Sequence, residues 1–130
     1  MNEQPSAREP LDRDRIVVRA IEFADEHGTD ALSMRKLAAE LGYEVMSLYN
    51  HVANKDEVLS LMVDVVAAEV PEPDPDDPPL VAVRTLAIEI RGTLVRHPWA
   101  ASLWLRQFPG PARVRQMEHL LAARAASDMS

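Results

Sequence analysis

Apolar residues recur every three or four positions along most of the chain, and polar residues occupy the other side of each turn. This period is that of an α-helix with one buried face. No stretch shows the strict alternation of a half-buried strand, so the pattern predicts an all-α protein. The predicted helices are 12–28, 33–42, 44–52, 54–70, 80–97, 99–108 and 112–126.

Residues that favour helix ends stand at the borders of these segments. Asp12 and Ser33 each precede an apolar periodic run, where their side chains can accept a backbone N–H as N-caps. Asn54 does the same for the fourth helix, and Glu57 three residues later completes a pattern close to a capping box. Gly42 follows the second run, where a helix end needs a residue that tolerates positive φ. We therefore expect helix borders at these residues.

The most informative stretch is 32–56, which opens with two short helices over 33–52. Leu37 and Leu41 belong to the apolar stripe of its first helix, and Leu48 and Val52 to that of its second. A tight glycine turn joins the two helices. Two helices that cross steeply over such a turn form a helix-turn-helix unit, whose second helix fits the major groove of DNA. The pattern predicts this unit, with 44–52 as the recognition helix.

The order of motifs across this stretch supports a family resemblance. Residues 32–59 read LSMRKLAAELGYEVMSLYNHVANKDEVL, with an S-x-R-K-L-A opening, an E-L-G-Y turn, an S-L-Y-x-H-V helix and an N-K-D start of the next helix. A glycine turn by itself is a weak signal, whereas this ordered set is a strong one. Over about residues 11–70, the chain resembles the DNA-binding domain of the tetracycline-repressor family of bacterial transcriptional regulators.

Composition and resemblance together divide the chain into four parts. Residues 1–10 are expected to be a disordered tail, and 11–70 a DNA-binding domain of three helices and a connecting fourth. Residues 71–79 read PEPDPDDPP, cannot be helical, and are expected to form an extended linker. By the resemblance, residues 80–130 form part of a helical effector-binding and dimerisation domain. This part is shorter than in relatives, as expected of either a short relative or a fragment.

The resemblance also implies which residues contact DNA. Lys55, at the start of a helix whose free N–H groups favour anions, is the leading phosphate ligand. Tyr49 is expected to contact a phosphate rather than to be a partly buried core aromatic. Arg35 suits a phosphate or a guanine edge, and the alternative is an ion pair with Asp30 or Glu40. The complete predicted set is Ser33, Arg35, Lys36, Val45, Met46, Ser47, Tyr49, Asn50, His51 and Lys55.

The start of the recognition helix departs from the family pattern. Val45, Met46 and Ser47 hold the base-reading positions, where the family usually has polar side chains. Val45 and Met46 cannot donate hydrogen bonds, but they can pack on thymine methyl groups; otherwise they are simply exposed apolar residues. Lys36 and His51 either contact DNA or are solvated. The departure leaves the operator sequence open, and DNA binding stays the prediction.

The charge distribution modifies this picture. The 130-residue chain has a formal net charge of −7 at pH 7, which taken globally disfavours DNA. Acids concentrate in 71–79, whereas the recognition region offers Arg35, Lys36 and Lys55. Local neutralisation of phosphates determines DNA affinity, so we expect modest affinity per subunit. The chain has no cysteine and no apolar run of membrane-spanning length, and we expect a soluble, cytoplasmic protein without a membrane partner.

Residues 80–130 offer a candidate ligand site. Trp99, Trp104, Phe108 and Met117 either line a pocket for a small apolar effector or form plain core. The histidines at 27, 51, 97 and 119 lack metal-ligand spacing, so no metal is expected. No nucleophile elbow or Gly-rich phosphate loop is evident, so we expect neither an enzyme nor a cofactor.

The sequence therefore predicts a sequence-specific transcriptional regulator, and the resemblance implies a ligand-responsive repressor of a palindromic double-stranded operator. DNA-binding domains of this type bind two half-sites of an operator, so function normally requires a dimer. We expect a weak homodimer through 99–108 and 112–126, or else an aggregation-prone monomer. The alternative, from another functional class, is a protein-interaction or effector-sensing fragment that no longer binds DNA.

Overall fold

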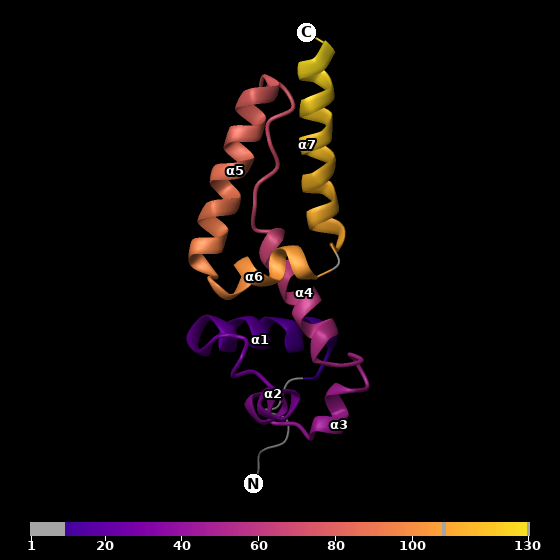
Figure 1. The fold of residues 1–130 in the computed structure, drawn as a ribbon. Coiled ribbons are helices and arrows are strands. Elements are labelled where there is room, and N and C mark those ends of the chain that lie inside the picture. Colours follow the sequence, from indigo (N-terminus) through magenta and orange to yellow (C-terminus); the bar gives the residue numbers. More distant parts are fainter. Residues whose placement is uncertain (1–9, 108, 130) are drawn as a thin grey trace. The chain divides into compact units, whose positions relative to one another are not determined.

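The fold of residues 10–107 and 109–129, which the computed structural model describes, is shown in Figure 1. All regular structure in these residues is helical, as the hydrophobic period predicted. Contacts divide the chain into two compact units, one up to Met62 and one from Val63 onward. The helices are α1 (Arg13–His27), α2 (Met34–Leu41), α3 (Val45–Leu48), α4 (Lys55–Ala67), α5 (Pro79–Arg96), α6 (Trp99–Arg106) and α7 (Pro111–Met129). Within the described ranges, none of these helices is long and apolar enough to cross a membrane.

Local capping sets the borders of the first helices. Oδ1 of Asp12 accepts the backbone N–H of Arg15 at 2.8 Å, at the start of α1. Oγ of Ser33 accepts that of Lys36 at 3.0 Å, at the start of α2. Gly42 ends α2 at φ +79° and ψ +30°, in the left-handed region where a side chain would be strained. The predicted caps are confirmed.

The first unit buries an aliphatic set of side chains. Helix α2 packs against both α1 and α3. Leu48 and Val52 are almost completely buried, and burial of side chains of this size contributes roughly 1.5–3 kcal/mol each. They hold the short α3 in place. The buried apolar residues of this unit are Ile16, Val17, Ala20, Ile21, Ala24, Leu32, Met34, Leu37, Ala38, Leu48, Val52, Val58 and Met62.

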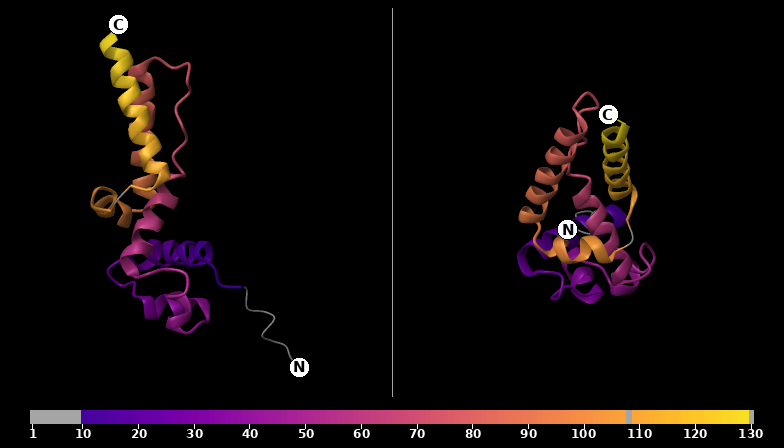
Figure 2. Two further views of the ribbon diagram at one scale, coloured as in Figure 1. Left: turned by 90° about the vertical axis from the view of Figure 1, so that its right-hand side faces the viewer. Right: turned by 45° about the horizontal axis from the view of Figure 1, so that its top comes forward.

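In the second unit, α5 and α7 lie side by side and antiparallel (Figures 1 and 2). Residues 71–78 run alongside them without helical structure, as their prolines predicted, and make a turn at residues 75–77. Pro79 then begins α5, because the first position of a helix needs no N–H donor. We expected the two parts of the chain to divide at this segment, whereas the contacts divide them within α4.

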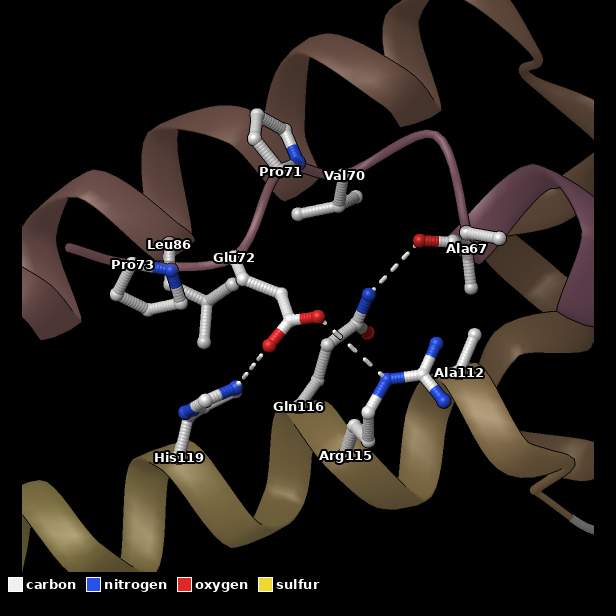
Figure 3. Close-up of a pocket in the computed structure, with 11 residues that line it drawn as sticks. Ala67, Val70, Pro71, Glu72, Pro73, Leu86, Ala112, Arg115, Gln116 and His119 are labelled. Atoms are coloured by element: carbon white, nitrogen blue, oxygen red, sulfur yellow. Dashed lines mark hydrogen bonds and ion pairs between the residues drawn. The ribbon is translucent and has the colours of Figure 1, made fainter. Parts of the chain in front are cut away.

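Polar contacts hold this segment against α7 (Figure 3). One carboxylate oxygen of Glu72 lies 3.1 Å from Nε2 of His119, and the other lies 3.9 Å from Nε of Arg115. Nε2 of Gln116 donates to the carbonyl of Ala67, the last residue of α4, at 2.8 Å. The end of α4 and the chain after it are therefore attached to one face of α7.

The start of α7 is capped by a residue of α4. Oδ2 of Asp64 accepts the backbone N–H of Ala112 at 3.4 Å, and Oδ1 accepts that of Arg113 at 3.3 Å. A Cβ at Gly110 would lie 2.5 Å from Cγ of Asp64, which is closer than atoms can pack. A side chain at residue 110 would therefore force the Asp64 carboxylate to move away from the start of α7.

The recognition helix is shorter than predicted. Instead of 44–52, only Val45–Leu48 is α-helical. The N–H of Asn50 then donates to the carbonyl of Ser47 at 3.3 Å, and that of His51 to Leu48 at 2.9 Å. These bonds span three residues instead of four, so the chain continues to wind as a tighter turn that is not counted as α-helix.

Other helix borders also differ from the prediction. Helix α4 ends at Ala67 rather than 70, because residues 68–70 form turns. Helix α6 ends at Arg106 instead of 108. Helix α7 extends from Pro111 to Met129, beyond the predicted 112–126, although its trailing residues have a poor apolar pattern. Alanine, which occurs four times in residues 122–126, is a strong helix former without needing burial.

Candidate nucleic-acid interface

Helix α3 and the turn after it, residues 45–51, contain no acidic residue, although exposed Glu44 directly precedes them. Val45, Ser47 and His51 are half-buried there, and Asn50 is exposed. Met46 is 69% exposed and Tyr49 43% exposed. This face therefore offers a methionine, a phenol, an amide, a hydroxyl and an imidazole to a partner.

Helix α2 adds two exposed cations, Arg35 and Lys36. The carboxylate of Glu40, a suggested partner of Arg35, instead pairs with Arg19, which also binds Glu22 at 2.8 Å. The hydrogen bonds that Arg19 donates, first to Glu22 and then to Glu40, raise the pKa of Arg19. Arg35 forms no ion pair with any residue that the structure describes. Its guanidinium is therefore available to an anion.

Two predicted DNA contacts also have structural roles. Oγ of Ser33 is occupied as the cap of α2, which leaves its hydroxyl proton to donate. Lys55 begins α4, as predicted, and its Nζ donates to the carbonyl of Thr29 at 3.1 Å. An ammonium group has three donors, so this bond leaves two for a phosphate. The Thr29 bond also fixes where the charge of Lys55 stands.

The start of α4 is capped by reciprocal bonds. Oδ1 of Asn54 accepts the N–H of Glu57 at 2.8 Å. The carboxylate of Glu57 accepts the N–H of Ala53 at 2.6 Å. This is the predicted capping box, except that its return bond reaches the residue before the cap instead of the cap itself.

Sequence reasoning missed Arg13 as a residue of this face. Its Nε donates to the carbonyl of His51 at 3.4 Å, across 38 residues of sequence. The side chain is exposed, so an additional cation stands beside the turn that follows α3. Nothing in the sequence near Arg13 indicates this, because the contact depends on how α1 packs.

A comparison with known families bears on this unit. The family described as bacterial regulatory proteins, tetR family, matches residues 16–62, from α1 into α4. The chain belongs to the tetracycline-repressor family.

Relatives and solved structures of the tetracycline-repressor family match well beyond the helix-turn-helix. An HTH-type transcriptional regulator of Saccharopolyspora erythraea is 41% identical over 128 residues, which are 96% of this chain and 54% of that protein. The ActR protein of Streptomyces coelicolor in complex with actinorhodin has a TM-score of 0.80 at 38% identity, over 91% of this chain and 56% of that one. BioQ bound to its double-stranded DNA operator has a TM-score of 0.85 at 28% identity, over 93% of this chain and 74% of that one. The chain thus spans about half the length of the curated relative.

In this member of the tetracycline-repressor family, the second unit contains a cavity of about 270 Å³. Of the four predicted pocket residues, Trp104 and Met117 line it. Trp99 does not: it is buried beside His97, with the ring centroids 5.9 Å apart. Phe108 lies outside the described residues. The described residues that line it are Ile90, Trp104, Leu105, Gln107, Pro109, Arg113, Gln116, Met117 and Leu120.

Two polar residues of this cavity, Arg113 and Gln116, were missed by sequence reasoning. Both are buried, although residues of these types usually lie at the surface. The available signal was their spacing of three residues on one helix face beside Met117. That spacing is as common on solvated helix faces, so it does not separate a pocket from a surface.

Proposed function

We propose that the first unit is the DNA-binding head of a transcriptional regulator that recognises a specific double-stranded operator. The observation that carries this proposal is the face of α3. Its polar and apolar side chains are exposed, while buried Leu48 and Val52 fix the helix beneath them. Exposed cations border the face, although the chain as a whole is acidic. A rigid, cation-bordered helix face suits a major groove.

Each predicted residue then has a distinct role. Val45, Met46 and Ser47 read base edges, with the two apolar side chains against thymine methyl groups. Phosphates are bound by the side chains that surround these three, which position the head without reading sequence. This second group comprises Ser33, Arg35, Lys36, Tyr49, Asn50, His51 and Lys55, to which the structure adds Arg13.

Regulation by this head is proposed to be repression, since a bound protein occludes polymerase from the operator. A palindromic operator requires two heads related by a two-fold axis, and therefore a homodimer. A small apolar or amphipathic effector in the cavity of the second unit would lower DNA affinity under one condition. It must bind more tightly to a dimer whose two DNA-binding units are not spaced to fit the operator. The solved complex of ActR with actinorhodin supports a small-molecule partner, and that of BioQ with its operator supports a DNA partner.

Selection of bound sequences from random DNA by the purified protein tests this function, followed by footprinting of the enriched sequence. We expect an inverted repeat whose half-sites contain thymine. Protection without sequence preference, or no binding at low salt, would contradict the proposal. That outcome would favour the alternative, a protein-interaction or effector-sensing fragment.

A further inference from the structure

Among the residues that the structure describes, the lining of the cavity in the second unit combines an apolar wall with a single cation. Trp104, Met117 and Leu120 are among the large apolar side chains that line it. The charged group among its lining residues is the guanidinium of Arg113, and this side chain is only 5% exposed. Lysine and arginine are almost never buried to this extent unless an acid pairs with them. The partners of Arg113 therefore decide what the cavity can bind.

The guanidinium of Arg113 is held by main-chain carbonyls. One terminal nitrogen donates to the carbonyl of Trp104, and the other donates to that of Gln107 at 2.7 Å. The third group, Nε–H, is buried and has no acceptor. Asp64 does not supply one, because its carboxylate accepts the main-chain N–H of Arg113 instead. Among the described residues, no carboxylate forms an ion pair with this guanidinium.

This arrangement leaves a buried positive charge with incomplete compensation. Burial lowers the pKa of Arg113, and the charge of Asp64 opposes that effect only in part. The face of the Trp104 ring lies 5.9 Å from the guanidinium carbon and provides some attraction. A buried charge remains costly unless an ion of opposite sign pairs with it. An anionic group at this edge of the cavity would therefore be bound more tightly than the same group is by an exposed arginine.

We propose that the cavity binds a small planar aromatic acid, with its carboxylate on the Arg113 guanidinium and its ring against Trp104 and Met117. This proposal rests on the proposed effector function and names the class of effector. The carboxylate supplies the missing counter-ion. An aromatic ring suits the indole face and the polarisable sulfur of Met117. A cavity of about 270 Å³, near the lower end for ligand sites, limits the ligand to a small ring system.

The test compares a charged ligand with its neutral analogue. Calorimetric titration of the whole chain with 2-naphthoate and with 2-naphthamide measures the two affinities under the same conditions. Because hydrogen bonds to charged groups are the strong ones, we expect the acid to bind about tenfold more tightly or better. Equal affinities, or no binding of either compound, would overturn the proposal.

Variants assign the preference to one residue. Arg113→Met should reduce the ratio of acid to amide affinity to about one, while Arg113→Lys keeps the charge and retains part of it. Arg115→Met is the matched control: this arginine lies on the same helix, contacts Glu72 and is 51% exposed, so its loss should leave the ratio unchanged. The assignment would be contradicted if the ratio of acid to amide affinity is unchanged in Arg113→Met, or if it falls equally in Arg115→Met. If Arg113→Met does not fold, the ratios of acid to amide affinity in Arg113→Lys and in the wild-type chain still test the assignment to Arg113.

DNA binding without ligand, measured by mobility shift on the same samples, separates the two proposals. If the protein binds its operator but binds the acid no more tightly than the amide, only the proposed ligand class is disproved. A protein that prefers the acid but binds no DNA retains the cavity assignment and loses the DNA-binding function.

Discussion

At the residue scale, Lys55 combines a structural bond with an available charge. Its Nζ donates to the carbonyl of Thr29 at 3.1 Å, so Lys55→Ala would remove both a hydrogen bond and a phosphate contact. Lys55→Gln removes the charge and keeps an N–H donor on a side chain that is one atom shorter. We expect this variant to keep its melting temperature and to weaken DNA binding equally across sequences. The slope of log K against log salt should fall by about one. An unchanged slope would show that Lys55 does not bind phosphate.

Met46 is the residue for which base reading can be tested by a single methyl group. It is 69% exposed on α3 and cannot donate a hydrogen bond. Replacing the operator thymines one at a time by uracil removes only the methyl. At the position that Met46 contacts, we expect about a fourfold loss of affinity, the value of one buried carbon. Met46→Ala should lose affinity for the normal operator and become insensitive to that uracil. Sensitivity that persists in Met46→Ala would assign the methyl to another residue.

At the element scale, the start of α7 depends on the approach of Asp64 to Gly110. Gly110→Ala places a Cβ where Asp64 now lies, so the carboxylate must move and the cap of α7 is lost. Loss of a cap costs about 1 kcal/mol, measured by urea unfolding. Asp64→Ala should cost a similar amount. The double variant should cost clearly less than the sum, because both changes break the same contact. Additive costs would show that the two residues act independently.

At the scale of the whole molecule, exposed leucines on α6 and α7 are the predicted dimer surface. Leu105 is 91% exposed and Leu121 67% exposed. We expect a mass above that of the monomer in light scattering as concentration rises. Leu105→Glu with Leu121→Glu should abolish this increase and weaken binding to a palindrome, while binding to one half-site stays unchanged. Val95→Glu on α5, at a residue 64% exposed, is the control. A soluble monomer that binds the palindrome tightly would contradict the prediction.

Much of the fold followed from interactions within about four residues of sequence. Asp12 and Ser33 each cap a helix through the N–H three positions later, so their chemistry and place in the apolar pattern were sufficient. Gly42 ended α2 for an equally local reason, its positive φ. Where local signals were weak, as after Leu48, the predicted border was wrong by several residues. The DNA-binding residues could be proposed because they lie within one ordered motif.

The sequence by itself determined the helices, their caps, the helix-turn-helix and the family, because each depends on neighbours along the chain. The tertiary structure decided which charges are buried and what they contact. Asp64 caps a helix 48 and 49 residues away, Arg13 reaches His51 across 38, and Lys55 reaches Thr29 across 26. Arg113 is covered by the chain of α6 and the loop after it, which turns an ordinary arginine into a buried cation. Desolvation and pairing of charges depend on distance in space, and the order of residues along the chain does not contain that distance.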